Sequence, residues 1–283
     1  MLLSSLMFVF TSSFIKAASI EANHFQAVFF RSIIPIPMIL AIARQRNISV
    51  WGTKRKLLFL RGFYGALQLQ FFIYAIINLR LGDVTIIAST WPLFVALLSP
   101  SMTKEKTPAF IFWMIPLFLI SLSLIIKPSS NFQLLPTLSA VSTAVGVAII
   151  SLIIRRLKNT DPPLVIVFYF VFFSTLLALP TVIYFWKPLS SLSYLQLFFS
   201  GLTAFVAQMS ITQAYRLGAP SFLSLFSYSS PVFAYVIGVI FFGEYPDIYA
   251  LIGTALIIVC GMYSIKLNNK DTLKNKLTSK ATL

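Results

Sequence analysis

The chain matches itself at a constant offset of 139 residues, and this internal repeat limits its possible folds more than any other feature. The aligned pairs of rarer residue types are Lys16 with Arg155, Gly62 with Gly201, Pro92 with Pro231, Glu105 with Glu244 and Lys127 with Lys266. Each copy contains five long apolar stretches, and because five is odd, two copies in tandem must enter a membrane from opposite sides. Inverted repeats of this kind are typical of transporters, whose substrate site lies between the repeats near mid-membrane.

The composition places the chain among membrane proteins. Of its 283 residues, 58% are hydrophobic and 10% are charged, whereas a soluble domain carries about 25% charged residues. We therefore expect an all-α integral membrane protein. The chain has one cysteine, Cys260, which can form neither an internal disulfide nor a cysteine metal site. Its one histidine, His24, cannot form a metal cluster. We therefore expect no cofactor and no metal.

Ten segments approach the roughly 20 apolar residues that a spanning helix needs. We place them at about 1–17, 23–43, 57–78, 83–101, 109–126, 134–154, 163–185, 193–215, 219–242 and 247–265. The first segment lacks a basic stretch and a small-residue cleavage site, and it aligns with the sixth. We therefore interpret it as a retained span and not as a signal peptide.

The basic residues set the orientation. With the N-terminus in the cytoplasm, sixteen Lys and Arg residues fall on the cytoplasmic side and four fall outside. The four outer residues are Lys16, Arg80, Lys127 and Lys187. Because cytoplasmic loops carry the excess of basic residues, both termini are expected in the cytoplasm. The domains follow as a first five-helix repeat at 1–127, a second at 128–266, and a basic, disordered cytoplasmic tail at 267–283 that can touch anionic lipid.

Several motifs of both copies carry a family resemblance. They are Phe29-Phe30-Arg31, Leu60-Arg61-Gly62, Leu81-Gly82-Asp83 and Thr90-Trp91-Pro92 in the first copy, and Gln213-Ala214-Tyr215-Arg216, Pro231-Val232-Phe233 and Gly243-Glu244-Tyr245-Pro246 in the second. The chain resembles the ten-helix EamA branch of the drug/metabolite transporter superfamily. The resemblance implies two inverted five-helix bundles around a central cavity, in the inner (plasma) membrane of a bacterium. Within that branch, the order around Arg31 and Glu244 is similar to that of S-adenosylmethionine uptake carriers.

Polar and aromatic residues on the helices expected to line the cavity are candidate substrate contacts. They are Trp91, Tyr228, Gln68, Tyr74, Gln208, Gln213, Thr90 and Ser227. An aromatic face can hold a sulfonium, an ammonium or a nucleobase, at about 0.5–2 kcal/mol for a cation. The alternative is structural, because single aromatics pack or anchor helices and glutamines also bridge helices by hydrogen bonds.

Pro92 and Pro231 occupy the same register in the two copies. A proline inside a helix removes a backbone donor and clashes with the carbonyl four residues earlier. In a membrane this is tolerated where protein or a wet cavity satisfies the freed groups. We interpret both prolines as hinges or cavity-lining helix breaks; a passive kink is the alternative.

Four charged residues are candidates for structural or gating roles. Arg31 lies about eight residues into its helix, where an unpaired cation costs roughly 2.5–3.5 kcal/mol at the bilayer centre. We favour a structural role for Arg31, with snorkelling to the outer surface as the alternative, and we expect Arg61 to anchor the cytoplasmic end of its helix. Glu105 and Glu244 lie where each can cap the N-terminus of the helix that follows, or act in gating.

These features favour a secondary transporter that moves a small polar metabolite by alternating access. No carboxylate falls in the middle of a predicted span, so we expect a facilitator or exchanger driven by the substrate gradient. S-adenosylmethionine uptake is the leading specific hypothesis, and export of an amino acid, another metabolite or a drug is the alternative. A polytopic membrane enzyme would need a carboxylate pair, a metal set or a nucleophile with its base, and the sequence offers none, so no enzyme is expected. The expected partners are a small-molecule substrate and the lipid bilayer, without nucleic acid, and a monomer is compatible with the sequence.

Overall fold

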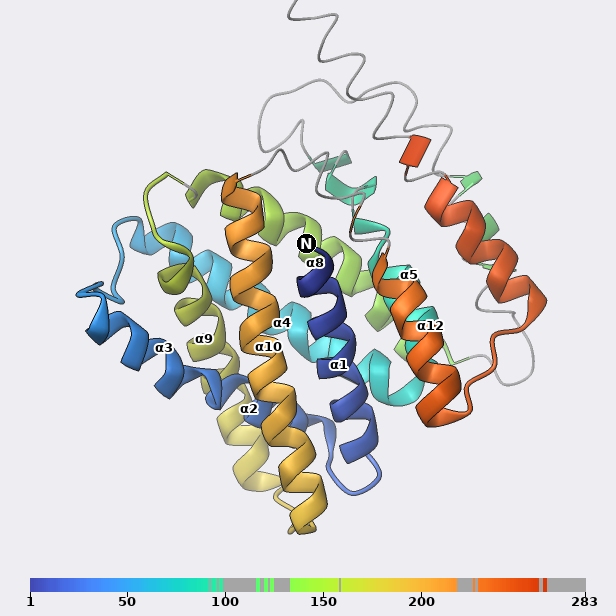
Figure 1. The fold of residues 1–283 in the computed structure, drawn as a ribbon, viewed down its shortest axis with the longest axis horizontal. Helices are drawn as coiled ribbons and strands as arrows, with labels where there is room; N and C mark the ends of the chain where they lie inside the picture. The colour runs from blue at the N-terminus through green and yellow to red at the C-terminus, as the bar shows by residue number, and fades with distance from the viewer. Residues whose placement is uncertain are drawn as a thin grey trace, which may run out of the picture.

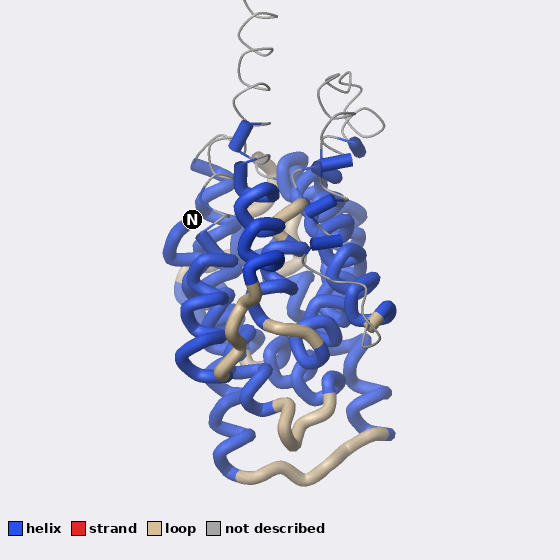
Figure 2. The backbone as a smooth tube through the Cα atoms, turned by 90° about the vertical axis from the view of Figure 1, so that its right-hand side faces the viewer, coloured by secondary structure: helices blue, strands red, loops and turns tan. Residues whose placement is uncertain are grey.

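The computed structural model describes residues 1–91, 93–95, 97–98, 116–117, 120–121, 123–124, 133–157, 159–217, 226, 229–259 and 262–263, without the side chains of 215–217. All regular secondary structure within these residues is helical. Figure 2 shows most of the helices running along one common direction, with loops at their ends. The predicted all-α class is confirmed for this part of the chain.

The labelled helices are α1 (Leu2–Ala18), α2 (His24–Ile33), α3 (Pro35–Gln45), α4 (Arg55–Asn78), α5 (Leu81–Ala88), α8 (Leu134–Leu157), α9 (Pro163–Tyr184), α10 (Ser191–Leu217) and α12 (Ser229–Phe242). Five helical stretches are long and apolar enough to cross a membrane: His24–Gln45, Arg55–Asn78, Leu134–Leu157, Pro163–Tyr184 and Ser191–Ala214. Shorter apolar helices are Leu2–Ala18, Leu81–Ala88, Ser229–Phe242 and Ile248–Val259. Most of the expected fifth span, at 109–126, and the tail at 267–283 lie outside the described residues.

Helix ends and helix contacts recur at the offset of 139. The ends of α1 and α8, of α3 and α9, and of α4 and α10 each lie 139 residues apart. Contacts recur in the same way: α1 packs on α10 as α8 packs on α4, and α10 packs on α2 as α4 packs on α9. Figure 1 shows α1 beside α10 and α5 beside α12. Elements from one half of the chain therefore pack mainly against elements of the other half.

Hydroxyl groups join α1 to the second half of the chain. Ser4 donates a hydrogen bond to the carbonyl of Ala207 over 3.0 Å, and the hydroxyls of Thr11 and Thr203 lie 2.9 Å apart. Between membrane helices, side-chain hydrogen bonds and close packing of small residues replace the hydrophobic effect as the cohesive force. α1 is thereby fixed against α10 along most of its length.

Two predicted spans are interrupted. The segment expected as one helix at 23–43 is divided into α2 and α3 at Ile34 and Pro35, because Pro35 has no N–H to donate to the carbonyl of Arg31. The segment expected at 83–101 breaks at Ser89 and Thr90, whose hydroxyls donate to the carbonyls of Thr85 (2.7 Å) and Ile87 (2.6 Å). The second break lies directly before Trp91.

Candidate functional site

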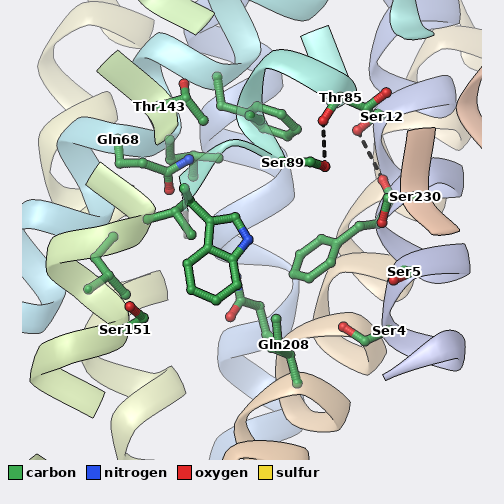
Figure 3. A pocket seen from close by; sticks show the side chains of 18 of the residues that line it. Ser4, Ser5, Ser12, Gln68, Thr85, Ser89, Thr143, Ser151, Gln208 and Ser230 are labelled. Atoms are coloured by element: carbon green, nitrogen blue, oxygen red, sulfur yellow. Dashed lines mark hydrogen bonds between the residues drawn. The ribbon is translucent and has the colours of Figure 1, made fainter. Parts of the chain in front are cut away.

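A cavity of about 190 Å³ lies between helices of the two halves of the chain. Its walls come from α1, α2, α4 and α5 of the first half and from α8, α9, α10 and α12 of the second. Figure 3 shows Ser4, Ser5 and Ser12 of α1 on one side of it and Thr143 and Ser151 of α8 on the other. The described lining is mostly apolar, with hydroxyl, amide and guanidinium groups set into it.

Three of the predicted substrate contacts line this cavity. Trp91 follows the break after α5 and is 8% exposed, and Gln68 of α4 and Gln208 of α10 are half-buried at the cavity wall. Gly146 of α8 lets α4 approach closely there, since a Cβ on Gly146 would lie 2.7 Å from the side chain of Gln68. The backbone of α8 therefore helps to hold Gln68 in place.

Other predicted contacts lie elsewhere. Tyr74 packs its ring 5.8 Å from that of His24, away from the lining residues, and Gln213 is exposed on α10. Thr90 is buried, but its hydroxyl bonds the backbone and it is not among the cavity-lining side chains. Ser227 and Tyr228 lie outside the described residues.

Of the two predicted prolines, Pro231 lies within the described residues and Pro92 does not. Pro231 lies buried in the first turn of α12, next to Ser230, which lines the cavity. The hydroxyl of Ser229 donates to the carbonyl of Phe226 over 2.6 Å. Pro92 and Glu105 lie outside the described residues. The hinge interpretation therefore remains a prediction for both prolines.

Arg31 and Arg61 reach the cavity from α2 and α4 and are almost completely buried, at 4% and 2% exposure. The central guanidinium carbons lie 6.0 Å (Arg31) and 4.7 Å (Arg61) from the centre of the Phe170 ring on α9. A side chain that is 2% exposed does not fit the surface anchor predicted for Arg61. Its depth follows from Gly65, one turn later, where a Cβ would collide with the Arg61 guanidinium and with Phe170.

Several hydroxyls that line the cavity were not among the predicted site residues. Ser4, Ser12, Thr143 and Ser151 all line it, and each donates its proton to a backbone carbonyl, at 2.8–3.0 Å. Their free lone pairs remain available as acceptors. Their spacing in the sequence could have indicated a shared helix face. Ser4, Phe8 and Ser12 recur every four residues on one face of α1. Thr143, Val147 and Ser151 do the same on α8.

Paired charges lie beyond one end of the cavity, and we call Lys16, Glu244, Arg80 and Asp83 the ionic layer. Lys16 at the end of α1 forms an ion pair with Glu244, and Glu244 also accepts a hydrogen bond from the backbone N–H of Leu81 over 2.8 Å. Glu244 thus caps α5, whereas the sequence analysis expected it to cap the helix that follows Glu244. Asp247 caps that following helix by accepting from the N–H of Ala250 (2.9 Å).

A second part of the layer surrounds Asp83 in the first turn of α5. Asp83 pairs with Arg80 over 2.6 Å and accepts a hydrogen bond from the Tyr235 hydroxyl of α12 over 3.0 Å. Ser12, which lines the cavity, and Lys16 are one turn of α1 apart, or about 6 Å along the helix axis. The layer therefore lies one turn beyond the cavity and joins the first half of the chain to the second.

Comparison with known proteins gives the family. Residues 134–265 match the model of the EamA-like transporter family. The chain is also 30% identical over 263 residues to the pseudopaline exporter CntI of Pseudomonas aeruginosa, with 91% of each protein covered. The chain belongs to the EamA-like transporter family. It is thus a multi-pass membrane protein of a transporter family, as the sequence motifs suggested.

Further similarities agree with this membership of the EamA-like family. Solute carrier family 35 member G1 of Mus musculus is 25% identical over 280 residues, which cover 91% of this chain and 74% of that protein. A solved crystal structure superposes with a TM-score of 0.67 at 18% identity, covering 94% of this chain and 96% of that one. The latter similarity supports the fold alone.

Proposed function

We propose that this EamA-like protein is a secondary transporter that moves a small polar metabolite across the inner membrane of a bacterium. Ten spans form two inverted five-helix halves, with both termini in the cytoplasm, and the halves rock about the cavity by alternating access. The observation that carries the proposal is the combination of a cavity lined by helices of both halves and an ionic layer that closes one end of it. In the proposed mechanism, the conformation with the ionic pairs formed is the one in which the cavity opens to the cytoplasm.

The ionic layer supplies the gate of this proposed mechanism. The side chains of Lys16 and Glu244 are 14% and 15% exposed, so separating them leaves two poorly hydrated charges. Breaking a buried ion pair by removing one partner costs about 3–5 kcal/mol. Outward opening must hydrate these groups, and a solute bound more tightly in the outward state offsets that cost.

Export is the direction we favour, because the relative at 30% identity is named an exporter. The alternative is S-adenosylmethionine uptake, as the sequence suggested. Trp91 supports the alternative, since an indole face in the cavity wall can hold a sulfonium or an adenine. The two cavity arginines weigh against it, because they repel a sulfonium and an ammonium.

Transport into proteoliposomes tests the proposal. Vesicles containing the purified protein are loaded with an unlabelled solute, and entry of the same radiolabelled solute is followed for acidic, neutral and basic amino acids, dicarboxylates and S-adenosylmethionine. We expect saturable entry of at least one solute, accelerated by the internal solute and insensitive to a proton ionophore.

Protein-free vesicles give the background rate of this assay. Loss of exchange on adding the ionophore would show a proton-coupled carrier and contradict the facilitator or exchanger mechanism. Entry of no solute above background, with folded protein in the vesicles, would contradict the transporter proposal itself.

A further inference from the structure

Arg31 and Arg61 are the ionisable side chains among the described residues that line the cavity. Within the described part of the chain, neither forms a salt bridge. The Nε atoms of both arginines, and Nη1 of Arg61, are buried without a hydrogen-bond partner. Two buried cations therefore line one small cavity, and the protein leaves part of their donor groups without a partner.

Such an arrangement is costly for a protein that gains nothing from it. A guanidinium stays protonated under all ordinary conditions, so burial cannot be relieved by loss of the proton. Taking one charge out of water costs several kcal/mol even after relaxation, while a contact with an aromatic face returns about 0.5–2 kcal/mol. The Phe170 ring, which both groups share, therefore offsets only part of the cost.

We propose that Arg31 and Arg61 bind the carboxylates of the transported solute, which is a small anionic amino-acid derivative carrying two carboxylates. This inference rests on the proposed function, because it assigns the cavity to the transported solute. The planar fork of each guanidinium fits a carboxylate through two parallel hydrogen bonds. Since both side chains line the same cavity, a single solute can contact both.

The other cavity groups fit the amino nitrogen of such a solute. The hydroxyls of Ser4, Ser12, Thr143 and Ser151 donate to backbone carbonyls, so toward the cavity they offer acceptors. An ammonium group has three donors and no acceptor. The cavity thus presents cationic donors for carboxylates and neutral acceptors for an ammonium group.

The size of the cavity agrees with this solute class. The cavity of about 190 Å³ has room for several water molecules, so a small polar solute fits within it. The charge of two arginines also selects a net anion over a cation of the same size.

Ligand-induced thermal stabilisation in detergent tests the assignment. L-aspartate and L-glutamate are compared with L-asparagine and L-glutamine, which have the same shape without the second carboxylate. We expect the acids to bind the wild-type protein about 10–100-fold more tightly than the amides, the range for a charge-assisted hydrogen-bonded contact. Arg31→Gln and Arg61→Gln each remove this preference, and Arg44→Gln, on the exposed end of α3, leaves it unchanged.

Two outcomes overturn the inference. One is equal binding of acids and amides by the wild-type protein; the other is an acid preference that survives in the Arg31→Gln/Arg61→Gln double variant. Exchange measurements separate this failure from that of the proposed function. If neutral or cationic solutes exchange in vesicles with either variant as in wild type, the protein is a transporter and only the carboxylate assignment is wrong.

Discussion

At the scale of single residues, buried charge distinguishes substrate contacts from structural ones. Lys16 and Glu244 are buried together as an ion pair, and Glu244 has a second partner in the N–H of Leu81. Arg31 and Arg61 are more deeply buried and have unpaired N–H donors among the described residues. The first arrangement stabilises the solute-free protein, and the second leaves two charges without a counter-ion among the described residues.

This contrast predicts opposite effects on stability. Arg31→Met and Arg61→Met each remove an unpaired buried charge, so each should raise the free energy of unfolding of the solute-free protein by about 1–3 kcal/mol. Lys16→Met leaves Glu244 poorly hydrated and without its cation, so it should lower that free energy by about 1–3 kcal/mol. Thermal or denaturant unfolding in detergent measures both. Destabilisation by the two arginine variants as large as that by Lys16→Met would show that the arginines are structural.

Some of the cavity-lining residues could be predicted from the sequence. Trp91 and Gln68 could be proposed because polar and aromatic residues are rare on helices of a membrane protein. The depth of Arg61 could not be predicted, because it depends on Gly65 and on the position of Phe170 in a distant segment. Ser12 and Ser151 were missed because hydroxyls on helices commonly bond carbonyls of their own helix, as these two do, and such residues do not by themselves indicate a cavity.

At the scale of helices, close contacts are made where the repeat places a glycine. A Cβ on Gly62 of α4 would lie 2.7 Å from the backbone carbonyl of Tyr169, and one on Gly201 of α10 would lie 2.7 Å from Ile34. Both glycines hold a helix of one half against a helix of the other. The offset of 139 residues in the sequence thus corresponds to a repeated helix contact in space.

These two glycines predict a matched set of variants. Gly62→Ala and Gly201→Ala should each lower the free energy of unfolding by about 1–3 kcal/mol, because the added methyl group forces packed helices apart. Gly238→Ala is the control, since its nearest neighbour would lie 3.4 Å away and alanine favours a helix. Melting temperatures of the three variants in one detergent measure the difference. Equal melting temperatures for all three would contradict the packing described for α4 and α10.

Helix positions were predicted better than helix breaks. The ends of α4, α8 and α9 lie within three residues of those expected, because long apolar runs bounded by turn residues define them. The break between α2 and α3 was not predicted, although Ile34-Pro35-Ile36-Pro37 carries its signal. In a membrane span a proline fits a break or a mere kink, and only the surrounding helices decide which forms.

At the scale of the whole molecule, two halves of the chain share a cavity and are joined at one face by the ionic layer. Lys16 of the first half and Glu244 of the second meet in that layer, one turn beyond the cavity-lining Ser12. Weakening the layer should therefore shift the protein toward the state that opens to the outside. The shift should be visible as a change in which side of the membrane reaches the cavity.

The measurement that tests this most directly is sided labelling of a cysteine in the cavity wall. Ser151→Cys is placed in a Cys260→Ser background and treated with a membrane-impermeant thiol reagent in vesicles of each orientation. Ser49→Cys and Ser191→Cys, both at exposed positions, report the cytoplasmic and the outer side. Adding Glu244→Gln weakens the ionic layer.

Alternating access through this cavity predicts that Ser151→Cys reacts mainly from the cytoplasmic side. It also predicts that Glu244→Gln moves much of this reactivity to the outer side. The two sided controls should keep their rates. Reaction of Ser151→Cys from both sides at once, at rates that Glu244→Gln does not change, would show an open pore and contradict alternating access through this cavity.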